Sequence, residues 1–424
     1  MKRLIVVLMV ATVGLGDAVP ARARAPELDS VRGWNELAVA AIRATRASDA
    51  DAARTYAMVN VAIYDAVHGL TGTRTPALVP GPGPRRADPR AAAVAAAHAV
   101  LVELDPTRLA TYDAQLAADL AALPDGPRRD AGAAWGADVG RRVVAARAGD
   151  GAAPPQTQPA GSGPGAFRAE WSGVQYRTVR PFAVADPAAY VPGPPPALTS
   201  VEYAAAVAEV AVLGNAAIAA PELLATYQFW AVPAGTGQPA GEWLRIALAV
   251  AAARELPLAQ QARLTALVTM ALADTTVATV ATKVTFRHWR PTTAIREADT
   301  DGNPLTAPDP AWAARAGSVG GTPEYVSGHS SYSGAAAAAL AGFFCADGIA
   351  FRHTTDTAPD GQARDYPGFS AAAAEAGRSR VFGGQHFEFS NQAGLHLGRG
   401  VAAEVLANRL LRVAGPTHVG DCPL

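Results

Sequence analysis

Three short motifs in the last third of the chain carry side chains that could bind an oxyanion and move protons around it. They supply three cations, two imidazoles, hydroxyl groups and a glycine. Cations and hydroxyls bind phosphate-shaped anions, and imidazoles suit acid–base or nucleophilic chemistry. The motifs are Lys283…Arg290-Pro291, Ser327-Gly328-His329 and Ser379-Arg380…His386.

In the first motif, Lys283 and Arg290 are seven residues apart. On a helix this spacing is ~700° of rotation, which puts both side chains within ~20° of one face. Pro291 disfavours helical backbone at Arg290, so the helix is expected to end about there. The alternative is two solvated cations on an exposed face, and the pair alone would favour it.

In the second motif, Ser327-Gly328-His329 precedes an alanine-rich run and predicts a loop that enters a helix. Free N–H groups at a helix start bind anions, and glycine lets a ligand approach closely. His329 would lie at the positive end of the helix dipole, which favours the neutral imidazole and an acid–base role. The alternative is an ordinary capped helix with a surface histidine.

In the third motif, Arg380 and His386 would lie ~240° apart if one helix carried both. Gly383-Gly384 is expected to end the helix and turn His386 back toward Arg380. A neutral imidazole there could ligate a metal centre or attack phosphorus. The alternative is a helix end followed by a packed histidine.

The elements around these motifs are predicted to be helices, because alanine-rich segments with Leu and Val at helical spacing dominate and strand-like alternation is scarce. We therefore expect an all-α protein. Two Pro/Gly-rich stretches, Pro76–Pro89 and Ala152–Gly165, interrupt the helices, and the second continues to Pro196 as an extended excursion whose aromatic residues should pack down. Helices resume near Ser200, which divides an N-terminal helical region, 26–199, from a C-terminal helical region, 200–424, that carries the motifs. We expect one compact unit.

The composition limits the classes of function. The 424 residues are 50% hydrophobic and 17% charged, enough for a large core, and the net charge is −1. No bulk field would recruit nucleic acid, so any anion site must be local.

The N-terminus has the pattern of an export signal. Lys2-Arg3 precedes an apolar run from Leu4 to Leu15, and small residues follow. We expect a signal peptide at 1–25 and a secreted or extracytoplasmic protein without a stable membrane span after its removal. The alternative, an uncleaved anchor, has a short apolar run for a span. In an exported protein, Cys345 and Cys422 could form a disulfide; the alternative is two unrelated thiols.

Taken in this order, the motifs K-x6-R-P, S-G-H and S-R-x5-H resemble the superfamily of type 2 phosphatidic acid phosphatases, bacterial acid phosphatases and vanadium-dependent haloperoxidases. The segments around them are similar to the bacterial secreted haloperoxidases, and weaker similarity extends upstream over most of the chain. The segments that carry the resemblance are His288–Pro291, Pro323–Ser330 and Gly377–Phe387.

The resemblance implies helical bundles of the acid phosphatase/haloperoxidase type, a vanadate cofactor and a peroxidase reaction. His386 would be the vanadium ligand and His329 the acid–base group. Hydrogen peroxide would oxidise a halide to hypohalous acid, which reacts with a small organic acceptor; a homodimer is possible. The residues that would hold vanadate are Lys283, Arg290, Ser327, Gly328 and Arg380.

Several positions depart from the family pattern or fall outside it. Val326 stands where many members have proline, and Thr322 stands where haloperoxidases have an aromatic or imidazole group near the halide, so the halide stays open. Arg287 and His288 add charge beside Arg290; His288 is expected at the rim, and the alternative is that it touches the pocket. Asp274 is nine residues before Lys283, ~180° around the helix, and should point away from the anion. The other histidines, predicted to be structural or on the surface, are His68, His98, His353, His396 and His418.

Two other functions remain open. An acid phosphatase would use the same anion site, with His386 as the nucleophile that forms a phosphohistidine and His329 as the acid that protonates the leaving group of a phosphate ester. A non-catalytic oxyanion-binding protein would need the cations but neither imidazole. A membrane-lipid phosphatase is disfavoured because the expected spanning helices are missing.

Overall fold

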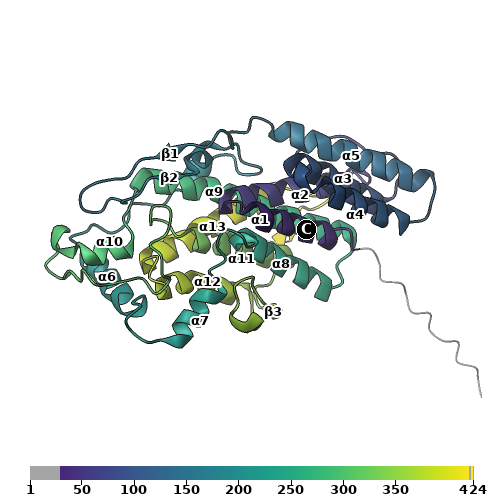
Figure 1. Ribbon diagram of the computed structural model, residues 1–424. Coiled ribbons are helices and arrows are strands. Elements are labelled where there is room, and N and C mark those ends of the chain that lie inside the picture. Colours follow the sequence, from purple (N-terminus) through teal and green to yellow (C-terminus); the bar gives the residue numbers. More distant parts are fainter. Residues whose placement is uncertain (1–28, 420–421, 424) are drawn as a thin grey trace, which may run out of the picture.

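The computed structural model describes residues 29–419 and 422–423, so the predicted signal peptide lies outside the described residues. The described chain forms thirteen α-helices, and its strands form three two-stranded antiparallel sheets. The prediction of an all-α protein is therefore confirmed. Figure 1 shows the helices gathered around a central group, with the long β1–β2 excursion along one side.

The centre of the molecule is α9 (Leu258–Phe286), which packs against α2 (Asp49–Gly69), α11 (Gly328–Phe344) and α13 (Glu388–Asn408). Within the described part of the chain, α9 is the one helix long and apolar enough to cross a membrane, but 94% of its most apolar window is buried inside the protein. Such burial is typical of a core helix, and it explains why α9 is apolar on all sides.

An N-terminal group of helices flanks this centre (Figure 1). It contains α1 (Arg32–Thr45), α3 (Pro89–Leu104), α4 (Leu109–Ala121) and α5 (Pro127–Arg147). Glycines every fourth residue on α5 let it approach α3 closely: a Cβ at Gly140 would lie 2.6 Å from the carbonyl oxygen of Ala96. One hydrophobic cluster runs from Val31 to Leu410 and includes residues on both sides of Ser200. The division into regions 26–199 and 200–424 stays a prediction.

The remaining elements surround the second half of the core. The helices are α6 (Val201–Leu213), α7 (Pro221–Phe229), α8 (Gln238–Ala253), α10 (Pro291–Arg296) and α12 (Phe369–Phe382). The paired strands are β1 (Thr157–Gln158) with β2 (Trp171–Ser172), β3 (Phe351–His353) with β4 (Arg364–Tyr366), and β5 (His418–Val419) with β6 (Cys422–Pro423). Cys345, which follows α11, is in a disulfide, and the side chain of Cys422, the chain's other cysteine, lies outside the described residues.

Two buried carboxylates hold the Pro/Gly-rich stretches against the central helices. Asp274 on α9 accepts N–H bonds at 2.7, 2.7 and 2.8 Å from residues 182, 183 and 184. Asp65 on α2 accepts three more, at 2.7 to 2.9 Å, from residues 77 to 79. The predicted packing of the excursion is confirmed, since Phe167, Trp171, Tyr176 and Phe182 are all buried. Asp274 is thus engaged by the excursion, as its predicted orientation away from the anion requires.

One predicted helix end is wrong. The first motif does not lie on one helix, because α9 ends at Phe286 and Arg287 adopts the left-handed conformation with φ 48°. Arg290 is extended, as the following proline favours, and caps α10. Lys283 and Arg290 therefore come from two elements joined by a turn.

The other two local predictions are confirmed. Ser327 is the N-cap of α11 and accepts the N–H of Ser330 through its side chain. The helix before His386 ends at Phe382, and Gly384 has φ +72°, which favours glycine. The turn brings the N–H of Gln385 within 3.0 Å of the carbonyl oxygen of Arg380.

Candidate functional site

A cavity of about 300 Å³ brings the three motifs together. Ser327 lies just behind its wall: it is fully buried, and its Oγ is 2.8 Å from Ser330 Oγ. None of the five histidines set aside by the sequence lines it. The predicted residues that do line it are Lys283, Arg290, Gly328, His329, Arg380 and His386.

Arg380 is the clearest sign of a missing anionic partner. It is 5% exposed, and its Nη2 donates to Gln385 Oε1. Its Nε and Nη1 are buried and have no hydrogen-bond partner among the described residues. Leaving a buried guanidinium N–H unpaired costs about 1–3 kcal/mol or more. An oxyanion in the cavity would satisfy these donors.

Arg290 is held in place by the segment that covers it. Its Nε donates to the carbonyl oxygen of Thr322 at 2.8 Å, and its Nη1 donates to that of Gln385 at 2.7 Å. Gly320 has φ +95°, and a Cβ there would lie 2.7 Å from Arg290 Cζ. Thr322, which stands where the haloperoxidases have a ring near the halide, holds the Arg290 guanidinium through its carbonyl oxygen.

Lys283 is buried, and its Nζ donates to the carbonyl oxygen of Pro323. Burial, with a smaller contribution from Arg290, lowers its pKa to about 7. A lysine with this pKa is a cation in slightly acidic solution and can lose its proton near neutrality. The site therefore combines two permanent cations with one that titrates.

His386 is oriented by a carboxylate that the sequence reasoning did not assign. Glu324 is fully buried, and its Oε1 lies 2.9 Å from His386 Nδ1 and accepts the N–H of Phe387 at 3.0 Å. Burial opposes ionisation of Glu324, but the imidazoles of His288 and His386 hold its pKa well below the usual range. Burial also lowers the pKa of His386 far below 6.5, with Arg290 adding to the effect, so the imidazole is neutral.

The tautomer of His386 follows from its partners. A carboxylate can only accept, so Nδ1 carries the proton and Nε2 keeps its lone pair. Arg290 Nη1 lies 2.9 Å from Nε2, and a guanidinium can only donate, which agrees with an unprotonated Nε2. This is the nitrogen that could ligate a metal or attack phosphorus. An acidic residue within an otherwise uncharged segment was the sequence signal that could have identified Glu324.

The prediction that His288 lies at the rim is wrong. Its side chain is 5% exposed, and its Nδ1 lies 3.5 Å from Glu324 Oε2, behind the cavity. The rings of Tyr203, Phe387 and Phe389 surround it. The backbone extends after α9 and turns this histidine inward, whereas Arg287 points to the surface and donates to the carbonyl oxygen of Pro159.

His329 faces the same cavity from the first turn of α11. Its Nε2 lies 3.1 Å from the carbonyl oxygen of Ala231, which can only accept, so Nδ1 is the unprotonated nitrogen. Burial, followed by Arg380, lowers the pKa of His329 well below 6.5. The predicted neutral imidazole is supported, and burial is its largest cause.

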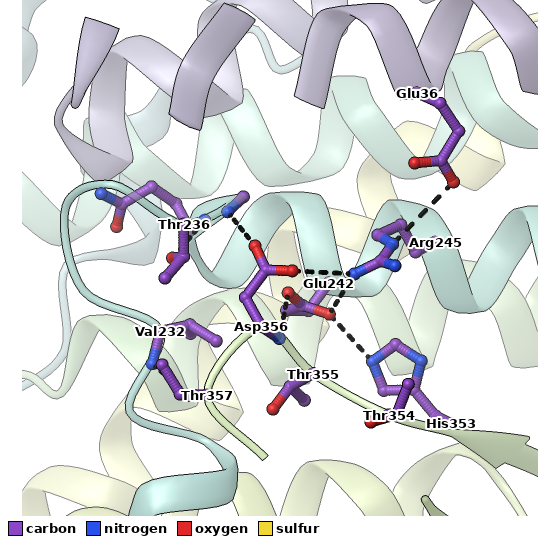
Figure 2. A network of polar contacts seen from close by, with 12 residues as sticks. Glu36, Val232, Thr236, Glu242, Arg245, His353, Thr354, Thr355, Asp356 and Thr357 are labelled. Atoms are coloured by element: carbon purple, nitrogen blue, oxygen red, sulfur yellow. Dashed lines mark hydrogen bonds and ion pairs between the residues drawn. The ribbon is translucent and has the colours of Figure 1, made fainter. Parts of the chain in front are cut away.

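The loop that carries Ala231 is fixed by a polar network (Figure 2). The Gly237 N–H donates to Asp356 Oδ2 at 2.8 Å. Arg245 lies 3.2 Å from Asp356 and 3.5 Å from the buried Glu242, whose carboxylate is also 3.1 Å from His353 Nε2. His353 is therefore structural, as predicted, and the network holds one wall of the cavity.

Three further lining residues escaped the sequence reasoning. Tyr227 stacks its ring on Arg380 at 5.1 Å, and Gln385 links Arg380 to Ser318. Asp49, at the start of α2, brings a carboxylate into the cavity. Asp49 and Tyr227 are distant from the motifs in the sequence, whereas Gln385 lies within the third motif, beside His386.

These residues fit a tetrahedral oxyanion such as vanadate. The unpaired N–H groups of Arg380 point to an anion, His386 Nε2 offers one lone pair, and Gly328 leaves room, since the nearest atom to a Cβ there would be 3.8 Å away. The fold and the site together define a helical protein whose cavity carries the donors that an oxyanion would need.

Comparisons with known proteins agree with this class. Residues 263–413 match the family model described as the VCPO second helical-bundle domain. The structure of the first bacterial vanadium-dependent iodoperoxidase is similar with a TM-score of 0.77 and 22% identity, over 91% of this chain and 97% of that one. The predicted resemblance to the vanadium-dependent haloperoxidases is confirmed.

Two structures of bacterial vanadium-dependent chloroperoxidase are also similar. The apo form has a TM-score of 0.63 and 18% identity, over 83% of this chain and 91% of that chain. The holo form has a TM-score of 0.65 and 17% identity, over 85% and 92%. At these identities the likeness concerns the fold. No curated protein sequence matches the chain.

Proposed function

We propose that the protein is a vanadate-dependent haloperoxidase that oxidises halide with hydrogen peroxide to hypohalous acid. The observation that carries the proposal is the cavity itself, where unpaired Arg380 N–H groups face a neutral histidine whose Nε2 is unprotonated. His386 would be the single protein ligand to vanadium. The groups that would hydrogen-bond the vanadate oxygens belong to Lys283, Arg290, Ser327, Gly328 and Arg380.

Bound vanadate would supply a Lewis acid that polarises hydrogen peroxide toward attack by halide. His329 Nδ1 accepts a proton from the incoming peroxide and returns it to the oxygen that leaves as water. Lys283 and Arg380 stabilise negative charge that develops on the oxygens, because they are fixed before the reaction and largely shielded from water. Halide, hydrogen peroxide and a proton thus give hypohalous acid and water.

The proposal extends to the surroundings of the enzyme. The disulfide at Cys345 favours an oxidising compartment, which supports export through the N-terminal segment. Hypohalous acid released from the cavity would halogenate a small organic acceptor. Thr322 leaves Tyr227 as the aromatic ring closest to the cation cluster, so iodide, bromide and chloride should be compared directly.

An acid phosphatase is the second candidate, favoured by the unprotonated His386 Nε2 beside three cations, which is also the arrangement of a nucleophile for a phosphate ester. The presence of His329 and His386 in one cavity argues against a purely binding role.

The test uses the purified protein with vanadate, peroxide and each halide, and follows halogenation of a dione reporter. Aryl phosphate hydrolysis is measured in parallel. Vanadate-dependent halogenation that disappears in His386→Ala, but persists in His98→Ala, supports the haloperoxidase; His98 is a matched control because it bonds Asp113 away from the cavity. If vanadate inhibits phosphate hydrolysis and no halogenation occurs, the protein is a phosphatase and the haloperoxidase proposal is wrong.

A further inference from the structure

A carboxylate in an anion-binding cavity needs an explanation. Asp49 lines the cavity together with three cations. Its Oδ1 accepts the N–H of Ala50 at 2.9 Å, whereas Oδ2 has no hydrogen bond to any described residue. Oδ2 lies 3.8 Å from the point that a Cβ on Gly328 would occupy. The free oxygen therefore faces the glycine where the anion is expected.

Helix capping does not account for Asp49. An acidic residue in the first turn stabilises a helix, but Ser48 and Asp51 already provide that function for α2. Ser48 accepts the N–H of Asp51, and Asp51 also accepts hydrogen bonds from Ser48 Oγ at 2.7 Å and Tyr176 at 2.5 Å. Asp51 has no place in the cavity lining, so the two carboxylates of this turn have separate surroundings.

The charge around Asp49 limits what it can bind. The protein atoms packed around the Asp49 carboxylate raise its pKa, Lys283 on α9 lowers it and Asp51 raises it, although the residue as a whole is solvent-exposed. The other titratable groups on the cavity wall are Tyr227, Arg290, His329, Arg380 and His386, and Tyr332 lies close behind it. An ionised carboxylate can only accept hydrogen bonds. It repels a fully deprotonated oxyanion, which offers only acceptors, but it can accept the O–H of a protonated one.

We propose that Asp49 is a specificity-determining residue that selects tetrahedral oxyanions carrying a proton over fully deprotonated ones, by accepting the ligand O–H at Oδ2. Below the pKa of Lys283, with Asp49 and Glu324 ionised, the three cations leave the site with one net positive charge, which matches a monoanion. The inference rests on the proposed function only for the tetrahedral shape of the ligand. It does not depend on halide oxidation.

Phosphate and sulfate test whether Asp49 selects protonated anions. Both are tetrahedral, but only phosphate keeps a proton near neutral pH. Dissociation constants for both are measured by calorimetry at about pH 6, where Lys283 is charged. The wild-type protein should bind phosphate roughly tenfold more tightly than sulfate. Asp49→Asn, whose amide can donate to sulfate, should lower the ratio of the two constants by roughly tenfold. Asp51→Asn removes the same charge from the same turn and should leave the ratio unchanged.

Equal binding of the two anions by the wild type, or an unchanged ratio in Asp49→Asn, overturns the inference. Asp49→Ser serves as the second variant if the amide variant does not fold, and it should also lower the ratio. The proposed function is tested separately by halogenation. If the protein discriminates phosphate from sulfate but oxidises no halide, this inference stands and the haloperoxidase proposal is wrong.

Discussion

Glu324 offers the sharpest test of how the site prepares His386. In Glu324→Gln the side chain keeps its shape, and the amide oxygen can still accept from His386 Nδ1 and Phe387 N–H, which share one carboxylate oxygen at 2.9 and 3.0 Å. What the variant loses is the negative charge. Hydrogen bonds to charged groups contribute about 1.5–3 kcal/mol and neutral ones about 0.5–1.5 kcal/mol, so the loss is about 1–1.5 kcal/mol. That energy corresponds to roughly tenfold weaker binding at Nε2.

Partners of metal-binding histidines typically change affinity 10- to 100-fold when mutated, so vanadate should bind about 10- to 100-fold more weakly to Glu324→Gln. Calorimetric titration of vanadate measures this, and nitrogen NMR of His386 checks that Nδ1 stays protonated. Glu375→Gln is the matched control, since this carboxylate accepts hydrogen bonds from Trp230, Arg364 and Tyr366 and does not line the cavity. Wild-type vanadate affinity in a folded Glu324→Gln protein would refute the role given to the charge.

Three further predictions concern other parts of the structure. Gly320→Ala should weaken sulfate and vanadate binding at least roughly tenfold, because a Cβ 2.7 Å from Arg290 Cζ displaces the guanidinium. Unchanged affinities in calorimetry would mean that the backbone around residue 320 moves instead and would contradict the prediction. Lys283 is charged below its pKa of about 7 and neutral above it, so sulfate affinity should fall about tenfold per pH unit above pH 7, whereas Lys283→Arg should remove this break. Asp274→Asn should lower the free energy of unfolding in urea by about 2–4 kcal/mol, since an amide cannot accept all three N–H groups of residues 182–184; an unchanged midpoint would contradict this.

Local sequence patterns were sufficient where the site depends on neighbours in the chain. Ser327 as a helix cap and the turn at Gly384 follow from side-chain capping and from glycine's access to positive φ. The end of α9 could not be predicted, because Arg287 takes the left-handed conformation that glycine or asparagine usually takes at a helix end. Lys283 and Arg290 line one cavity, as predicted, but they do not share a helix face, which was the reason for the prediction.

Long-range contacts set the rest of the site. Asp49 precedes the first motif by more than two hundred residues, and only the packing of α2 on α9 places it near Lys283. His288 was expected at the rim of the pocket. A buried carboxylate, Glu324, and three aromatic rings draw it inward instead. Neither the approach of Asp49 to Lys283 nor the burial of His288 follows from a periodic pattern in the sequence.

The cavity is assembled from chain segments between residues 49 and 386, so no short segment of the chain contains it. A ligand bound there would recognise the folded chain and not the unfolded one. By mass action, an oxyanion at a hundred times its dissociation constant would add about 2.7 kcal/mol to the unfolding free energy. The melting temperature should therefore rise with oxyanion concentration, and the supply of the oxyanion would influence how long the folded protein survives.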